Sequence, residues 1–226
     1  METVTGDDFP MTSQIRHGWH SVPMPESAEE VYARVVAAVG EDGRLPAPPL
    51  ADWDIFPWEV VDGAIAPKVL PPPADEKPRA GESGTPCPTC DRDPALDIWE
   101  NARWIVTGMK QPAGLPLALF LQTKEHLDFT DMDDDLAAEY GRITVWLTRI
   151  MSHLPNIGRV HVNRWGDGSA HLHVWFLART ERLTGVLGSY AVEWDGVLPP
   201  TPEEVWRADL ATIAHKLANH DGRARV

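Results

Sequence analysis

The chain has 226 residues, of which 43% are hydrophobic and 24% are charged, as is typical of one sizeable globular domain with or without elaborations. Its formal net charge of -14 disfavours broad electrostatic binding to a nucleic acid polymer or an anionic membrane, although a local cluster of donors could bind an anionic small molecule. No stretch reaches the roughly 18 apolar residues that a membrane helix requires, and the first residues lack a signal-peptide pattern. We therefore expect a cytoplasmic protein.

The N-terminal third combines one helix with a proline-rich region. Ser27 and Glu30 form a capping-box pattern within residues 25–40, whose valines fall on one face, and Gly40 can close the helix. Residues 41–86 are too rich in proline to sustain regular elements. We interpret them as an extended wrap around a core or, alternatively, as a loose linker. The aromatic anchors of such a wrap would be Trp53, Phe56 and Trp58.

The middle of the chain predicts an antiparallel sheet with a helix inserted between two strand pairs. Residues 102–108 and 115–123 have the pattern of adjacent strands, and residues 132–154 carry apolar side chains at helical spacing behind an acidic first turn. Residues 159–165 and 170–179 read as two further strands around a WGDGS turn. We therefore expect an α+β fold, with an antiparallel sheet and packed helices.

A last helix is expected in the tail. Thr201 has the position of its N-cap, and Pro202 that of its first residue. Its apolar stripe is typical of packing against a core and consists of Trp206, Leu210, Ile213 and Leu217. These patterns divide the chain into an N-terminal extension (1–84), a core (85–182) and a C-terminal helical extension (183–226).

Both cysteines of the chain lie in one CPTC motif, Cys87 to Cys90. The two-residue spacing lets both thiolates bind one tetrahedral zinc ion, and it also occurs in redox pairs. A redox pair is expected at a strand-to-helix junction, whereas this motif follows a proline-rich coil, which favours a metal. Two cysteines do not complete a structural site, so histidines must supply the other ligands. The candidates are His126, His161, His171 and His173.

The segment AHLHVWF alternates like a strand. Because successive side chains of a strand point to opposite faces, His171, His173 and Trp175 should share one face. Two histidines in this arrangement are either partly buried and hydrogen-bonded, or a metal ligand beside an acid–base group or nucleophile.

The order of these motifs resembles the histidine triad superfamily, specifically its zinc-bearing branch, which includes the galactose-1-phosphate uridylyltransferases. The resemblance rests on CPTC, WENARWIV, QTKEHLDFTDM and VHVNRWGDGSAHLHVWF, and it spans about residues 85–180. It implies a nucleotidyl hydrolase or transferase, in which His173 attacks the α-phosphorus of a nucleotide and forms a covalent intermediate that water or a second phosphate resolves. The structural Zn²⁺ ligands that it implies are Cys87, Cys90, His126 and His171.

The residues around the WGDGS turn could hold a phosphate group. Gly166 and Gly168 supply backbone N–H groups, and Ser169 supplies a hydroxyl that could assist catalysis. The resemblance places Asn163 at the phosphate site, with a turn-capping role as the alternative. Arg164 could neutralise a phosphate or form a surface ion pair.

Two positions depart from the family pattern. Trp175 stands where typical members have His and the uridylyltransferases have Gln, so the usual group that hydrogen-bonds the phosphate or leaving group is missing. The indole N–H of Trp175 could bind the substrate instead, with a different reach and geometry. Lys110 lies near the place of an acidic residue that binds ribose; it could bind a phosphate or carboxylate instead, or be a solvated loop lysine. His161 could replace the missing histidine as a general acid, or be an ordinary buried histidine.

These departures leave two other functions open. One is a degenerate relative that binds a nucleotide or other phosphorylated ligand without turnover, and the other is an enzyme of specialised biosynthesis with a non-nucleotide substrate. FPWEV, RWGDGSAHLHVWFLAR and WDGVLPP also resemble a histidine-triad-like group from high-GC bacteria. The family usually forms two-fold homodimers by extending the sheet, and the N-terminal wrap of this chain could cover that edge.

Overall fold

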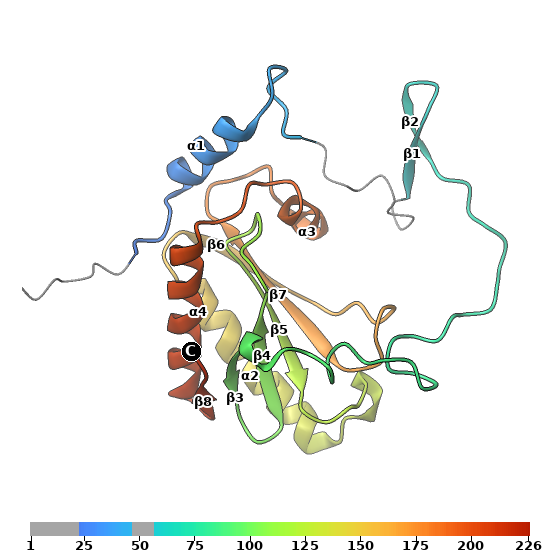
Figure 1. Cartoon of the computed structure of the whole chain (residues 1–226), viewed down its shortest axis with the longest axis vertical. Helices are drawn as coiled ribbons and strands as arrows, with labels where there is room; N and C mark the ends of the chain where they lie inside the picture. Colours follow the sequence, from blue (N-terminus) through green and yellow to red (C-terminus); the bar gives the residue numbers. More distant parts are fainter. Residues whose placement is uncertain (1–22, 47–56) are drawn as a thin grey trace, which may run out of the picture.

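A six-stranded antiparallel sheet organises the computed structural model, which describes residues 23–46 and 57–226 (Figure 1). The strand order is β6-β7-β5-β4-β3-β8, and every neighbouring pair runs antiparallel. The strands are β3 (Asp97–Glu100), β4 (Trp104–Gly108), β5 (Leu117–Thr123), β6 (Ile157–Asn163), β7 (His173–Thr180) and β8 (Arg223–Ala224). The α+β fold expected from the sequence is confirmed.

The expected strand pairs, β4 with β5 and β6 with β7, are also confirmed. Strands β3 and β8 were not predicted. They are four and two residues long, which is too short for the alternation of a strand to be recognised in the sequence. β7 begins at His173 and not at Ala170, because the Leu172 N–H donates to the Leu127 carbonyl at 2.7 Å, outside the ladder. His171 therefore precedes the strand.

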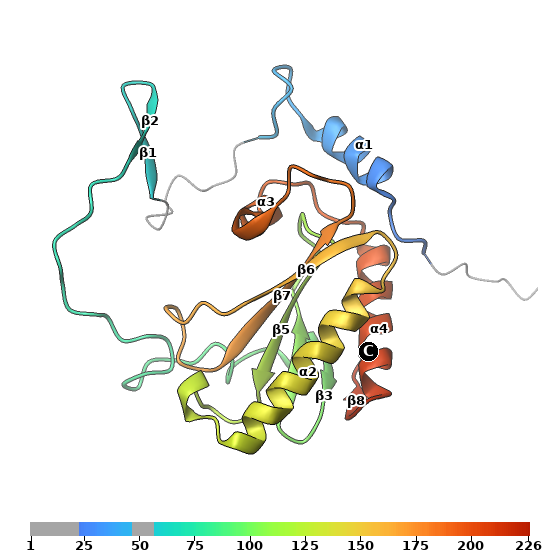
Figure 2. The ribbon, with the colours of Figure 1, turned by 180° about the vertical axis from the view of Figure 1, so that it is seen from behind.

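Helices α2 (Asp134–Ser152) and α4 (Glu203–Ala218) cover one face of the sheet (Figure 2). Trp99, Trp104 and Phe176 of the sheet are fully buried beneath them. Burial of one such side chain contributes about 1.5–3 kcal/mol, so this shared core attaches the C-terminal helix firmly to the strands. The expected apolar stripes are buried here, as shown by Leu136, Ile143, Leu147 and Ile150 on α2 and by Trp206, Leu210, Ile213 and Leu217 on α4.

The opposite face of the sheet is covered at one end by residues 183–198, which contain η4 (Gly188–Tyr190) and α3 (Ala191–Asp195). Asp195 holds this segment in place, because its backbone carbonyl accepts from the Gly114 N–H at 3.0 Å and its carboxylate accepts from the Leu115 N–H at 2.8 Å. A second apolar cluster results, made of Leu115, Ala118, Leu177, Val186 and Ala191.

Helix α1 (Ala28–Ala38) begins with the predicted capping box, in which the Glu30 N–H donates to Ser27 Oγ at 3.3 Å and the Ser27 N–H donates to the Glu30 carboxylate at 2.7 Å. Only part of the expected apolar face is used, because Val31 is buried while Val36 is 50% exposed. The helix ends at Ala38 and its C-cap is Val39, so Gly40 lies one residue beyond the cap.

A β-hairpin interrupts the proline-rich region, contrary to the expectation that residues 41–86 form no regular element. Strands β1 (Trp58–Val61) and β2 (Ala64–Pro67) pair around Asp62 and Gly63, whose φ angles of 51° and 80° suit a tight two-residue turn. The hairpin projects away from the sheet (Figure 1), and Trp58 is 47% exposed, so its expected role as a core anchor is wrong. Trp53 and Phe56 lie outside the described residues.

The start of α4 differs from expectation, because Thr201 is not its cap. The N-cap residue is Pro202, whereas the buried Thr201 donates from its N–H to the Ala113 carbonyl at 2.9 Å and from its hydroxyl to the Leu115 carbonyl at 3.4 Å. Thr201 thus ties the loop before α4 to the loop before β5.

Among the helices of the described segments, none is long and apolar enough to cross a membrane.

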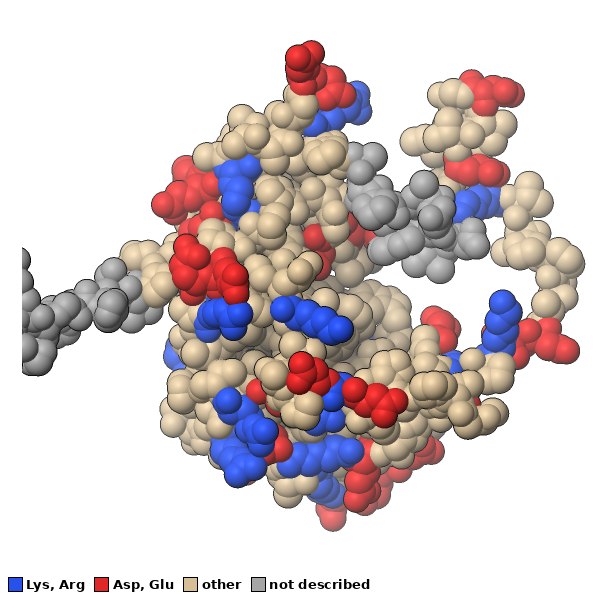
Figure 3. Space-filling view, viewed as in Figure 1, with Lys and Arg blue, Asp and Glu red and all other residues tan. Residues whose placement is uncertain are grey.

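The last residues of the chain close the β3 edge of the sheet. Glu100 of β3 binds Lys124 at 2.9 Å and Arg225 at 2.8 Å, and it also pairs with Arg223. Hydrogen bonds from Lys124 and Arg223 lower the pKa of Glu100 to about 2. Figure 3 shows basic side chains gathered near β3 and β8, intermixed with acidic ones. Charge pairing with Glu100 therefore holds β8 on the sheet.

Candidate metal centre and active site

Four residues from three separate segments form one cluster. Cys87 and Cys90 lie in the turn before η2 (Pro94–Leu96), His126 lies in the loop after β5, and His171 lies just before β7. Their ligand atoms are all within 4.8 Å of one another. The distance from sulfur to Nδ1 is 3.4 Å for Cys87 with His171, for Cys90 with His126 and for Cys90 with His171. The structure thus brings together the four expected metal ligands.

The CPTC turn is folded so that its two sulfurs point the same way. The Cys90 N–H donates to Cys87 Sγ at 3.4 Å, and the Asp91 N–H donates to the Cys87 carbonyl at 3.0 Å. Gly81 packs against this turn with a φ of 88°, and a Cβ at this position would lie 2.6 Å from Cε1 of His126. The left-handed backbone and the close approach both require glycine at position 81.

The ring of His171 is held from both sides. Its Nε2–H donates to the backbone carbonyl of Thr123 at 2.9 Å, which leaves Nδ1 free to face the cysteines. The side chain is buried, and this burial lowers the pKa of His171, so the imidazole is neutral near pH 7. A neutral imidazole whose distal N–H is hydrogen-bonded to a carbonyl is the usual form of a metal ligand.

His173 is the first residue of β7 and is half-buried. Its Nδ1–H donates to the backbone carbonyl of His171 at 2.8 Å. This bond fixes the tautomer, so that the lone pair of the imidazole is on Nε2, and it fixes the orientation of the ring. The backbone of His171 thereby positions His173.

Five side chains of neighbouring strands share one side of the sheet, which we call the His173 face. Gln122 on β5 is the partner of His173 on β7, and Trp175 is the partner of both Phe120 and Asn163. Directly paired residues of antiparallel strands point to the same face. The His173 face consists of Phe120, Gln122, Asn163, His173 and Trp175.

The indole of Trp175 is packed among aromatic rings. Its ring centroid lies 4.2 Å from that of Phe120 and 5.8 Å from that of Trp165. Phe120 in turn lies 6.3 Å from His173. Trp175 is thus part of an aromatic wall beside His173.

The structure does not bring His161 or Lys110 to His173. His161 is the partner of Leu177, four residues from His173 along β7, a separation of about 13 Å at the usual strand rise. Burial and the nearby Arg179 lower the pKa of His161. Lys110 is exposed in the loop after β4, at the end of the sheet opposite to His173.

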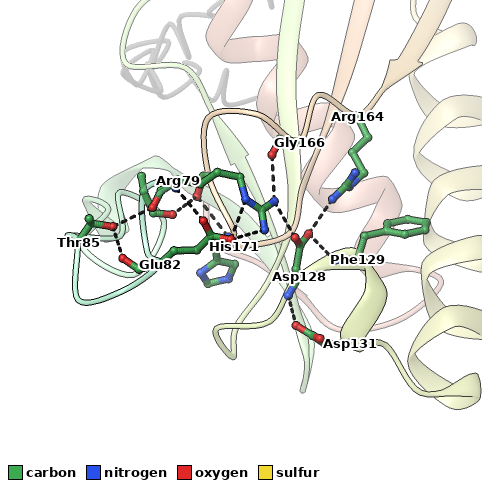
Figure 4. Close-up of polar contacts among 11 residues, drawn as sticks. Arg79, Glu82, Thr85, Asp128, Phe129, Asp131, Arg164, Gly166 and His171 are labelled. Atoms are coloured by element: carbon green, nitrogen blue, oxygen red, sulfur yellow. Dashed lines mark hydrogen bonds and ion pairs between the residues drawn. The ribbon is translucent and has the colours of Figure 1, made fainter. Parts of the chain in front are cut away.

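A charge cluster fixes the loop between β6 and β7 (Figure 4). Asp128, next to η3 (Phe129–Asp131), binds Arg164 at 2.7 Å and Arg79 at 2.8 Å. Arg79 also binds Glu82 at 2.6 Å and donates to the Gly166 carbonyl at 3.0 Å. Burial opposes ionisation of Asp128, but the Phe129 N–H and the two arginines hold its pKa below the ordinary value. Arg164 thus forms an ion pair within the protein.

The rest of the turn is tied to the segment before the CPTC motif. The Ala80 N–H donates to the Gly168 carbonyl at 3.1 Å. The Ser169 hydroxyl donates to the Ala80 carbonyl at 3.3 Å and accepts from the His171 N–H at 3.3 Å. The hydroxyl of Ser169 therefore holds the loop that carries His171, and its expected catalytic role stays a prediction.

Sequence reasoning missed Gln122, Phe120, Arg79 and Asp128. One signal was available for Gln122, because it is a polar residue in the otherwise apolar run LALFLQT. No such signal exists for Arg79 and Asp128, since an ion pair between residues distant in the sequence depends on the tertiary fold.

Comparison with protein-family models finds no match, and comparison with curated proteins finds none either. Among solved structures, similarity is found to a histidine triad protein from Bradyrhizobium japonicum (16% identity, TM-score 0.44, 54% of this chain and 90% of that one). A histidine triad protein from Marinobacter aquaeolei VT8 is similar to the same degree (16% identity, TM-score 0.44, 54% of this chain and 88% of that one). A Zn-bound histidine triad family protein from Mycobacterium smegmatis is also found (18% identity, TM-score 0.40, 57% of this chain and 90% of that one). The similarity covers about half of this chain.

Proposed function

We propose that the chain is a nucleotidyl hydrolase or transferase that works through a covalent intermediate on His173 and is built around a structural zinc ion. The observation that carries the proposal is the hydrogen bond from His173 Nδ1–H to the His171 carbonyl at 2.8 Å. It links a nucleophile of fixed tautomer to the backbone of a metal-ligand residue. The motif order of the sequence, which resembles the histidine triad superfamily, supports the same reaction.

The cluster of Cys87, Cys90, His126 and His171 fits zinc. At ordinary Zn–S and Zn–N bond lengths, a tetrahedral ion separates a sulfur from a nitrogen ligand by about 3.6 Å. The three sulfur-to-nitrogen distances of 3.4 Å agree with this value. Two thiolates and two neutral imidazoles suit the borderline-soft character of Zn²⁺ and balance its charge. Four protein ligands leave no position for water, so the ion would be structural.

The chemical step follows from the free Nε2 of His173. A bond forms between Nε2 and the α-phosphorus as the bond from phosphorus to the leaving group breaks. The leaving atom, which is an oxygen in an ester or anhydride and a nitrogen in a phosphoramidate, keeps the electron pair and takes a proton from water. The resulting phosphoramidate is then cleaved, either by water for hydrolysis or by a second phosphate for transfer. A neutral imidazole is a competent nucleophile near pH 7, and Nδ1–H remains bonded to the His171 carbonyl throughout.

The phosphate group would lie against the His173 face and the turn that follows β6. Asn163 shares the face, and the carbonyls of Gly166 and Gly168 are bound by Arg79 and Ala80. These bonds fix the turn through its carbonyls. Within the described residues, the N–H groups of the turn donate to no backbone acceptor. Preorganised N–H groups of this kind stabilise phosphoryl oxygens.

The position of Trp175 favours turnover over binding without chemistry. Blockage of the reaction would require the indole to cover His173, whereas its ring contacts are with Phe120 and Trp165. The aromatic wall offers a stacking surface for a planar base at the side of the nucleophile. Lys110 is too far along the sheet to replace a ribose-binding carboxylate at His173.

The test uses ³¹P NMR to monitor the consumption of three substrates, adenosine phosphoramidate, diadenosine tetraphosphate and UDP-glucose. We expect one of them to be consumed by the wild-type protein, and we expect His173→Ala to lower kcat at least about 10³-fold. His153→Ala, which removes an exposed histidine from the end of α2, should retain wild-type activity. Equal activity of His173→Ala and the wild type would contradict the proposal.

A further inference from the structure

Gln122 is the polar side chain directly across the sheet from His173, since the two residues are partners in the β5–β7 ladder. Side chains of such a pair have Cβ atoms about 5 Å apart, within reach of one bound group. Gln122 lies at the end of the strand whose next residue, Thr123, binds the ring of His171. Its backbone is therefore fixed relative to the metal centre and to His173.

The amide of Gln122 has an unmet hydrogen-bonding capacity. The residue is 8% exposed, and within the described ranges its Oε1 has no hydrogen-bond partner. Buried polar groups in native proteins are almost always satisfied, so an unpaired one calls for an absent partner. A 180° turn of the amide can present either the oxygen or the NH₂ group to that partner.

Three other side chains near His173 are engaged with residues of the protein. The indole of Trp175 is packed against Phe120 and Trp165. Arg164 and Arg79 are both bound by Asp128, so neither presents an unpaired charge to a ligand. A phosphoryl group on His173 would therefore meet Gln122 as its polar neighbour on the β5 side.

We infer that Gln122 is a substrate-binding residue whose NH₂ group donates a hydrogen bond to one non-bridging oxygen of the phosphoryl group that His173 attacks. This inference rests on the proposed function. The non-bridging oxygens lie to the side of the attack axis, where a residue on the adjacent strand can reach them. Gln122 thus provides an amide donor from β5, whereas the donor of Trp175 on β7 is an indole N–H of different reach and geometry.

The two non-bridging oxygens are stereochemically distinct, and Gln122 contacts one of them. Replacement of that oxygen by sulfur, a poorer hydrogen-bond acceptor, should remove most of the benefit of the amide, whereas sulfur at the other position should leave it intact. The wild-type protein should therefore discriminate between the two phosphorothioate diastereomers. This discrimination depends on the amide and not on the packing of the strand.

The experiment compares the wild type with Gln122→Met, which preserves the length of the side chain and removes the amide. The probes are the p-nitrophenyl ester of thymidine 5′-monophosphate and the separate Rp and Sp isomers of its phosphorothioate. We expect the variant to lose about 10²- to 10³-fold in kcat/KM with the oxygen ester, as is usual for removal of one donor to a transition-state oxygen. We expect a similar loss with one thio isomer and a loss under about threefold with the other, so that the Rp/Sp ratio changes at least about 30-fold.

Two results would overturn the inference, and they differ from each other. If the wild type turns over the esters and Gln122→Met changes all three rates by the same factor, Gln122 has a packing role and the proposed function stands. If neither the wild type nor the variant turns over any ester or natural nucleotide substrate, the proposed function fails and the role of Gln122 fails with it. Thr107→Val, a buried change at the partner position of Phe120, should leave the Rp/Sp ratio at the wild-type value.

Discussion

The His171 carbonyl accepts a hydrogen bond from His173 Nδ1–H at 2.8 Å, while the ring of His171 faces the two cysteines. One residue thus contributes its side chain to the Cys/His cluster and its backbone to the position of His173. The integrity of the cluster and the orientation of His173 are therefore coupled.

Loss of the metal should impair both stability and activity. Cys90→Ser or His126→Ala should lower the metal content from one zinc per chain to under about 0.2, because removal of one ligand from a four-ligand site strongly weakens binding. Metal analysis together with the d–d absorption of the Co²⁺-substituted protein measures the content and the geometry. Full zinc occupancy in both variants would exclude this ligand set.

Gly81→Ala should disturb the metal centre more than a matched glycine change. The added Cβ would lie 2.6 Å from His126 Cε1 and require a shift of that ligand. Gly84 has a similar φ of 83° but no atom within 4 Å of such a Cβ, so Gly84→Ala isolates the cost of the left-handed backbone, about 1–2 kcal/mol. Denaturation with and without chelator compares the two variants. An equal loss of stability and zinc affinity would show that the contact with His126 is unimportant.

Asp209 on α4 should make the protein less stable as the pH rises. It is 8% exposed, and burial raises its pKa from 3.8 to about 6. Below pH 3.8 the group is protonated in both the folded and the unfolded state; as the pH rises through 6, the folded state must bear a buried carboxylate, and stability falls.

Asp209→Asn should therefore raise the free energy of unfolding by about 1–3 kcal/mol at pH 8, and by progressively less as the pH falls toward 5. Urea denaturation between pH 5 and 8 checks this. Asp75→Asn, in the exposed segment after the hairpin, serves as the control with no expected change. A constant difference between Asp209→Asn and the wild type across this range would contradict the assignment.

The β1–β2 hairpin and residues 71–78 should be cleaved before the six-stranded sheet and the helices that pack on it. An isolated two-stranded hairpin is marginally stable in water, and residues 71–78 are exposed. Endoproteinase Glu-C should cut after Glu76 and leave a resistant fragment that retains Arg79 and all four metal ligands. Mass spectrometry and metal analysis of the fragment test this, and cleavage within the six-stranded sheet at the same rate would refute it.

The long amphipathic elements could be predicted from the sequence because their periodicity spans many residues. Helix α2 and the strands β4 and β5 lie where apolar spacing places them. Strands β3 and β8 could not be predicted, since pairing with the rest of the sheet and the contacts of Glu100 stabilise them more than local propensity does. Threonine is a common N-cap residue, but the Thr201 hydroxyl donates to the Leu115 carbonyl and does not cap the helix.

The metal cluster could be predicted because its four residues carry characteristic ligand atoms in a recognisable order. The surroundings of His173 could not, because they depend on register. The pairing of β6 with β7 places His161 at Leu177, and the pairing of β5 with β7 places Gln122 at His173. A shift of two residues along either strand would give His173 a different partner while keeping every side chain on the same face. The alternation of apolar and polar residues therefore does not identify the register.

Intact-protein mass spectrometry tests the proposed covalent intermediate on His173 most directly. After brief incubation with adenosine phosphoramidate, diadenosine tetraphosphate or UDP-glucose and rapid quenching at high pH, where a phosphoramidate persists, the wild type should gain the mass of one nucleotidyl group. The adduct should be lost on acid treatment, should map to the peptide that contains His173 and should be absent from His173→Ala. An adduct of the same mass on His173→Ala, or turnover by the wild type with no adduct under any quench, would contradict the account.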